Sequence, residues 1–155
     1  MEGLVPRIRR TYRNASEKPL LARAEMRINV AAFRYRPAFA FKQLSDRKVT
    51  SNPDFQRRFR EALLEGARQG VRGFVSDIAV DTGPWGFNPT DIQAPVRWWH
   101  GDKDSASPLG HAQYVIDILP NAELTVVNGG GHFMIHTIIE DVLSALASHL
   151  KQRGS

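Results

Sequence analysis

Two stretches decide the fold: PVRWWHGDKD at residues 95–104 and ELTVVNGGGH at residues 123–132. Each opens with a short β-prone run that turn residues bound, and this pattern is typical of a strand. A helix is predicted over residues 109–119, between the two strands, and a last helix carries apolar residues on one face from Ile138 to Leu150. The order strand–helix–strand–helix predicts a parallel α/β sheet with flanking helices.

The carboxyl ends of parallel strands are where functional groups collect in such sheets. The first predicted strand runs into Asp102 and Asp104, and the second runs through Gly129–Gly131 into His132. The glycines permit a sharp turn with positive φ. A carboxylate and an imidazole are therefore expected side by side, in the arrangement by which a buried acid orients a histidine base.

The first 83 residues have a different character. Apolar positions at helical spacing predict a helix from Leu20 to Tyr35, whereas residues 1–18 are polar, basic and without a clear period. Residues 51–54 (Ser-Asn-Pro-Asp) are typical of a helix start, and Gly70 is expected to close that helix. Another short helix is predicted over residues 71–83, before the proline-bounded loop at residues 84–89.

Composition narrows the possible functions. The 155 residues include no cysteine, which excludes disulfides, thiolate metal sites and cysteine nucleophiles. The net charge of +5 is unevenly distributed, because residues 1–76 hold 17 Lys and Arg against 7 Asp and Glu, and residues 77–155 hold 4 against 9. No apolar run reaches membrane-spanning length and no signal-peptide pattern opens the chain, so a cytoplasmic protein without a membrane span is expected.

Residues 84–150 resemble the C-terminal part of an enzyme of the α/β-hydrolase fold. The matching elements, in order, are Pro84-Trp85-Gly86-Phe87, Ile92 with Pro95-Val96, His100-Gly101-x-x-Asp104 with Pro108, Leu119-Pro120-x-Ala122, and Gly130-Gly131-His132-Phe133. The resemblance implies that residues 84–155 are the C-terminal part of the α/β-hydrolase core and that residues 1–83 are the helical cap, or lid, over its site. It makes Asp104 the acid and His132 the base of a catalytic triad. Trp85 and Phe133 are further candidates for the substrate pocket, although packing on the sheet is the simpler role for Phe133.

The nucleophile of that family has no counterpart in this sequence. Its serine lies in Gly-x-Ser-x-Gly, and no such motif occurs in the 155 residues. An α/β sheet domain of this kind commonly runs to about 200–250 residues. The resemblance therefore implies a truncated serine hydrolase for a small ester or acyl substrate, inactive or weak alone; an aspartate nucleophile, as in related enzymes, is an open alternative.

Two other functions remain open at this stage. One is a non-catalytic interaction domain, or half of a split hydrolase whose remaining strands a second chain supplies. A homo-oligomer is a further possibility. Alternatively, the arginine-rich first half binds nucleic acid or anionic lipid, although a solvated helical face explains those arginines better.

No cofactor or metal is expected. His132 and His136 have the spacing of paired zinc ligands, but Phe133 stands where a zinc hydrolase would have glutamate. His100 is expected to fill core space beneath the site. Asp102 is expected to be a solvated turn residue, and the motif favours Asp104 as the acid.

Overall fold

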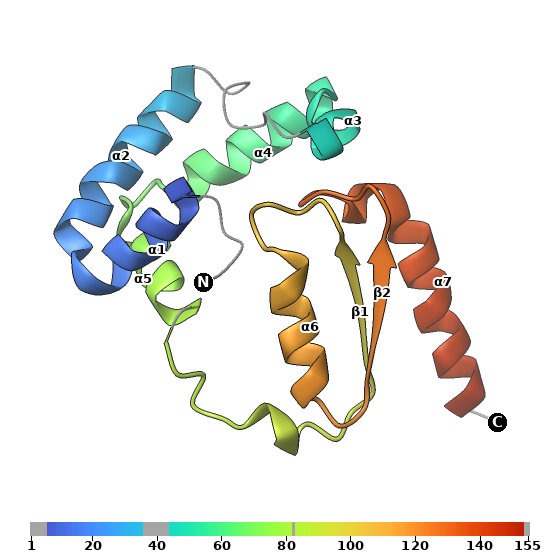
Figure 1. The fold of residues 1–155 in the computed structure, drawn as a ribbon. Helices are drawn as coiled ribbons and strands as arrows, with labels where there is room; N and C mark the ends of the chain where they lie inside the picture. The colour runs from blue at the N-terminus through green and yellow to red at the C-terminus, as the bar shows by residue number, and fades with distance from the viewer. Residues whose placement is uncertain (1–5, 36–43, 82, 154–155) are drawn as a thin grey trace.

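The computed structural model describes residues 6–35, 44–81 and 83–153. Its helical part comprises α1 (Pro6–Glu17), α2 (Pro19–Tyr35), η2 (Leu44–Asp46), α3 (Arg47–Thr50), α4 (Pro53–Gly66) and α5 (Arg72–Asp81). Its α/β part comprises η3 (Pro89–Asp91), β1 (Val96–Gly101), α6 (Leu109–Ile118), β2 (Ala122–Val127) and α7 (Ile135–Arg153). Figure 1 shows the helical part beside the α/β part, with α3 and α4 across the tips of the strands.

The predicted α/β class is confirmed. The strands β1 and β2 are parallel and in register from Val96 opposite Ala122 to Gly101 opposite Val127. The helix α6 connects them, and α6 and α7 lie on the two sides of the strands (Figure 1). Both strands consequently end at the same edge, the one that faces α3 and α4.

The helical part has a small core of its own. Ala15, Ala22 and Val75 are buried, and Met26 and Ile78 pack against them. Small side chains let α1, α2 and α5 approach closely, and apolar burial of this kind is the main favourable contribution to folding. This small core therefore lies within the helical part, although Leu20 and Ile28 of α2 remain exposed.

The helix α1 was not predicted, because residues 1–18 show no clear apolar period. Its basic residues Arg9, Arg10 and Arg13 interrupt the apolar spacing. Its short inner face ends at the buried Ala15. Tertiary packing, rather than an obvious sequence stripe, stabilises such a helix. The helices α2, α4 and α5 lie where helices were predicted, whereas η2 and α3 were not predicted.

The predicted start of α4 is confirmed in detail. Asn52 is the N-cap, and its side-chain oxygen accepts hydrogen bonds from the backbone N–H groups of Asp54 (2.9 Å) and Phe55 (3.3 Å). The helix ends at Gly66, earlier than the predicted closure at Gly70, which lies beyond it with a φ of 97°.

The α/β part also leaves apolar surface uncovered. On α7, the exposed fractions of Ile139, Leu143 and Leu146 are 44%, 56% and 54%. Within the described residues each strand has a single hydrogen-bonded neighbour, so each has one free edge. None of the helices described is long and apolar enough to cross a lipid bilayer.

Candidate active site at the strand tips

Asp104 lies in the loop that follows β1, and its side chain is only 7% exposed. Its Oδ1 atom accepts hydrogen bonds from the backbone N–H groups of Ala106 (2.8 Å) and Ser107 (2.9 Å). An aspartate that bonds the backbone two and three residues ahead closes its own turn. The turn fixes the carboxylate and leaves Oδ2 directed at the neighbouring loop.

His132 follows β2 through the three glycines. Gly129 takes a φ of 72°, which glycine adopts without steric cost, and the chain reverses there. The carbonyl of Gly130 accepts a hydrogen bond from the backbone of Lys103 (2.9 Å), so the two loops are joined at their main chains. A Cβ atom at Gly101 would overlap with the Gly130 backbone, which explains why glycine is needed at this crossing.

The two side chains meet as the strand order predicts. His132 Nδ1 lies 3.0 Å from Asp104 Oδ2. The carboxylate can only accept, so the ring carries its proton on Nδ1 and donates it to Asp104. The imidazole is 46% exposed, and its other nitrogen, Nε2, keeps a free lone pair in this tautomer.

The electrostatics of both groups agree with this pairing. The hydrogen bond to Asp104 raises the pKa of His132; burial opposes this, and the charges of Asp104 and Asp46 add to it. Burial acts to raise the pKa of Asp104, but the hydrogen bonds from His132 and from the N–H groups of Ser107 and Ala106 outweigh it and lower the pKa. The acid is therefore ionised at neutral pH and stabilises a protonated His132.

His100 lies beneath this pair and is 8% exposed. Its Nδ1 accepts a hydrogen bond from Trp98 Nε1 (3.4 Å), so Nε2 donates to the carbonyl of Ser107 (2.7 Å). His100 therefore fills the core as expected, and it also supports the far end of the Asp104 turn.

Asp102 is a turn residue, as expected, and it also makes contacts that the sequence did not predict. Its Oδ1 accepts a hydrogen bond from the backbone of Gly129 (2.6 Å), and its Oδ2 lies 3.1 Å from Lys103 Nζ. The hydrogen bond from Lys103 lowers the pKa of Asp102, and the bond from Gly129 acts in the same direction. Asp102 thus ties the two loops together, while Asp104 faces the imidazole.

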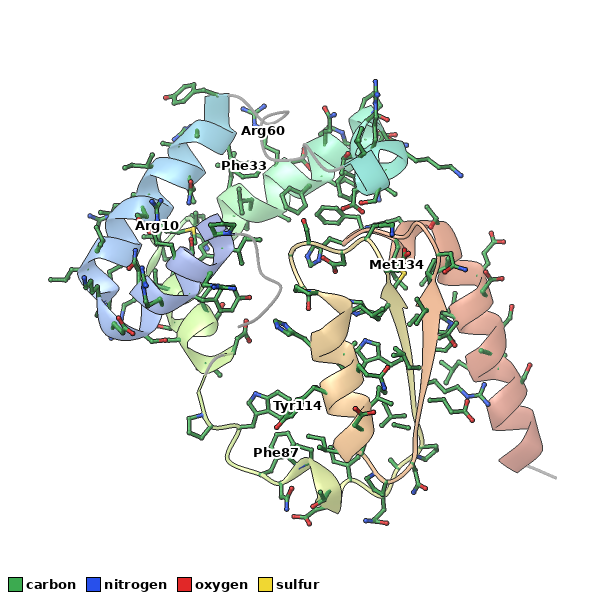
Figure 2. The ribbon with its side chains drawn as sticks, viewed as in Figure 1. Arg10, Phe33, Arg60, Phe87, Tyr114 and Met134 are labelled. Atoms are coloured by element: carbon green, nitrogen blue, oxygen red, sulfur yellow. The ribbon has the colours of Figure 1, made fainter. Side chains whose placement is uncertain are left out.

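Of the two candidate pocket residues, Phe133 lies beside the imidazole of His132 and Trp85 does not. The ring of Phe133 packs edge-on against His132 (5.2 Å between ring centroids), Phe55 (5.1 Å) and Phe59 (5.7 Å), so it joins the site to α4. Trp85 packs against Phe87 at 5.8 Å. Figure 2 shows Phe87 at the opposite end of the sheet from Met134, so the structure does not bring Trp85 to the imidazole.

Asp46 belongs to the same site and was missed from the sequence. It is 3% exposed, and its carboxylate accepts hydrogen bonds from the backbone N–H groups of His132 (3.0 Å) and Phe133 (2.8 Å). Its partners are 86 and 87 residues away in the chain. No local pattern indicates such a contact, because Asp46 stands among the polar residues Ser45, Arg47 and Lys48.

A pocket of about 550 Å³ opens beside the site, between the helical part and the start of α7. Its lining residues are Lys48, Val49, Asn52, Asp54, Phe55, Arg58, Phe59, His136 and Thr137. His132 and Asp104 do not line it, but Phe55 and Phe59 contact Phe133 from its wall. In the described part of the chain, no group of three or more His, Cys, Asp or Glu is placed to hold a metal ion.

Comparison with known proteins gives one partial similarity. The chain is 33% identical over 89 residues to a pimeloyl-[acyl-carrier protein] methyl ester esterase of Aromatoleum aromaticum. The similarity covers 53% of this chain and 35% of the relative, so the chain matches about a third of the relative's length. No family model and no solved structure matches the chain.

Proposed function

We propose that this chain supplies the acid and the base of a serine-hydrolase site of the α/β-hydrolase type, for a small ester or acyl substrate. The observation that carries the proposal is the 3.0 Å contact between the buried Asp104 carboxylate and the half-exposed His132 ring at adjoining strand ends. The partial similarity to an esterase supports the same class of reaction.

In this proposal His132 is the general base. Its Nε2 takes the proton of a serine hydroxyl as the serine attacks the acyl carbon, and gives that proton to the alcohol that leaves. It then takes a proton from the water that attacks the acyl-enzyme and returns it to the serine oxygen as the acid is released. Asp104 holds the ring in the tautomer that leaves Nε2 free and stabilises the imidazolium that forms. General-base catalysis of this kind contributes about 10²–10⁴-fold in rate.

The nucleophile comes from a polypeptide segment outside these 155 residues, because the sequence has no Gly-x-Ser-x-Gly. The α/β part offers a surface for such a segment. A sheet edge is free, the apolar residues of α7 are exposed, and a groove of about 220 Å³ separates Trp99 of β1 from Val142 and Leu146 of α7. Free edges and exposed apolar faces favour strand pairing and burial by a partner.

The helical part acts as the lid in this proposal. It lies across the strand tips, and α4 contacts Phe133, next to the base. The adjacent pocket places the aromatic Phe55 and Phe59 near the basic Lys48 and Arg58. Apolar walls with a few polar groups are typical of ligand sites, so this part is positioned to select the substrate.

A fluorophosphonate probe tests the proposal. The chain alone should not be labelled, whereas a fusion behind the serine-bearing segment of the Aromatoleum esterase should be labelled at that serine. We expect His132→Ala and Asp104→Asn to slow the labelling at least 100-fold. Asp117→Asn is the matched control, because Asp117 is an exposed acid on α6 that bonds Gln113 (2.8 Å).

The outcomes separate the possible roles. Labelling that depends on His132 and Asp104 but not on Asp117 supports the proposal. Equal labelling of the His132→Ala fusion contradicts it, and labelling of the chain alone at one of its own serines contradicts the assignment of the nucleophile.

A further inference from the structure

The strongest feature that the proposed mechanism leaves unused is the buried carboxylate of Asp46. It belongs to η2 of the helical part, yet both of its oxygens bind the histidine loop of the α/β part. A buried carboxylate is costly unless hydrogen bonds compensate it, and here two main-chain donors do so.

We propose that Asp46 is a positioning residue for His132: its two-oxygen contact with the main chain at His132 and Phe133 fixes the imidazole on Asp104, and its negative charge favours the imidazolium. This inference rests on the proposed function, since it assigns Asp46 a role through the base of that site. It also makes the base depend on a contact from the helical part.

The backbone at His132 needs such an acceptor. The chain makes a helical turn before α7, with Met134 N bonded to Gly131 O (3.2 Å) and His136 N bonded to Phe133 O (3.1 Å). The N–H groups at the start of a helical turn have no partner within the turn. A carboxylate satisfies them and interacts favourably with the positive end of the peptide dipoles.

Gly131 is matched to this contact. A Cβ atom there would overlap with the carboxylate of Asp46. The third glycine of the loop is therefore required for close approach of Asp46, since its own φ lies outside the positive range that Gly129 adopts. The glycines of residues 129–131 thus serve the turn, the crossing with Gly101, and the Asp46 contact in succession.

The charge of Asp46 also acts on the imidazole. The groups that bear on His132 are Asp104 at Nδ1 and Asp46 behind the main chain, with His100 near Asp104 at 4.0 Å. Both carboxylates raise the pKa of His132, Asp104 more than Asp46. When His132 takes a proton during the reaction, both charges are already in place to stabilise it.

Thr50 provides the matched control for the local structure. Its hydroxyl donates to the backbone carbonyl of Asp46 (2.9 Å) and is buried, so it stabilises the η2–α3 segment without touching the carboxylate. The variant Thr50→Val disturbs the same segment, whereas Asp46→Asn removes the charge and one acceptor oxygen. A purely structural role predicts the same behaviour for both variants.

The experiment is an NMR titration of the full 155-residue chain. The Cε1 proton of His132 reports its pKa, and hydrogen exchange reports the His132 and Phe133 amides. We expect Asp46→Asn to lower the pKa of His132 and to speed exchange of both amides about ten- to hundredfold, because each loses a bond to a charged group. We expect Thr50→Val to leave the pKa of His132 unchanged.

Unchanged His132 titration and unchanged exchange in Asp46→Asn would overturn the inference, as would an equal pKa change in Thr50→Val. Asp104→Asn separates this inference from the proposed function, because an unchanged pKa of His132 in that variant contradicts the catalytic pair itself. If Asp46→Asn does not fold, the wild-type chain decides. In that chain, slow hydrogen exchange of the His132 and Phe133 amides, with amide chemical shifts that follow the titration of a carboxyl group, supports the contact. Fast exchange of both amides overturns it.

Discussion

Most buried apolar residues of the described chain lie in the helical part, whereas the unpaired strand edges lie in the α/β part. The helical part buries Ala15, Ala22 and Val75 among its own helices. The α/β part leaves Leu143 and Leu146 of α7 more than half exposed and both strands with a free edge. Both parts also expose large apolar side chains, Leu20 and Ile28 of α2 among them, so the contrast lies in the free strand edges of the α/β part, as far as the described residues go.

Several specific contacts join the two parts. Asp46 binds the histidine loop, Phe55 and Phe59 pack on Phe133, and the Ser45 hydroxyl lies 3.5 Å from the carbonyl of Lys103. All of these contacts lie at the strand tips. The candidate site is therefore also the junction of the two parts.

The largest expected effect is at this junction. Gly131→Ala places a Cβ atom against the Asp46 carboxylate, and we expect the free energy of unfolding to fall by about 3 kcal/mol, from overpacking and lost hydrogen bonds. Urea denaturation followed by circular dichroism measures it. Gly110→Ala on α6 is the control, because its added Cβ meets nothing within 4 Å and should stabilise the helix slightly. Equal effects would show that the junction is not tightly packed.

The second largest expected effect is the difference in unfolding free energy between matched alanine variants of the two parts. Val75 is 4% exposed, and Val75→Ala should lower the free energy of unfolding by about 2 kcal/mol. Leu143 is 56% exposed, and Leu143→Ala should change it by less than about 0.5 kcal/mol. Thermal and urea melts of both variants measure the contrast. A large loss in Leu143→Ala would mean that α7 already covers its own core.

The pH dependence of stability tests the ion pair in the α/β part. The raised pKa of His132 contributes stability that is complete below its ordinary value of 6.5 and is lost as the pH rises through the folded-state pKa. The lowered pKa of Asp104 contributes stability above its ordinary value of 3.8, which is lost as the pH falls through the folded-state pKa. The pair therefore stabilises the chain most between pH 3.8 and 6.5.

We expect this contribution to be below about 1 kcal/mol, because the His132 ring is half exposed to solvent. Urea melts across the pH range measure it. His132→Gln should flatten the dependence in that window, and an unaltered curve would contradict the ion pair.

The smallest expected effect concerns the basic surface of the helical part. Arg68 Nε lies 2.8 Å from Glu65 Oε1, with both side chains about two-thirds exposed. Arg68→Ala should lower the free energy of unfolding by only about 0.3 kcal/mol, since exposed ion pairs are weak. Melts at low and high salt measure it. A loss above 1 kcal/mol would show that charge, rather than the buried core, stabilises this part.

The sequence predicted the α/β part well because its signals are local. The strands are bounded by turn residues, and parallel pairing brings their ends to one edge, so the meeting of Asp104 and His132 followed. The start of α4 was equally predictable, since the capping residue Asn52 acts within three residues of itself.

The misses have physical causes. The helix α1 was missed because its basic residues interrupt the apolar spacing of the face that carries Ala15. Asp46 was missed because its hydrogen bonds join segments 86 and 87 residues apart, which no local period encodes. The hydrogen bond that Asp102 accepts from Gly129 was not predicted, because Gly129 lies on the neighbouring loop.

Asp46 accepts hydrogen bonds from backbone N–H groups rather than from side chains. Every residue except proline offers the same N–H group, so the identity of residue 133 is not restricted by this anchor. A library randomised at position 133 should therefore vary the wall next to the imidazole while its backbone anchor persists. The contact therefore constrains the backbone path of the loop and leaves the side chain at position 133 open to selection.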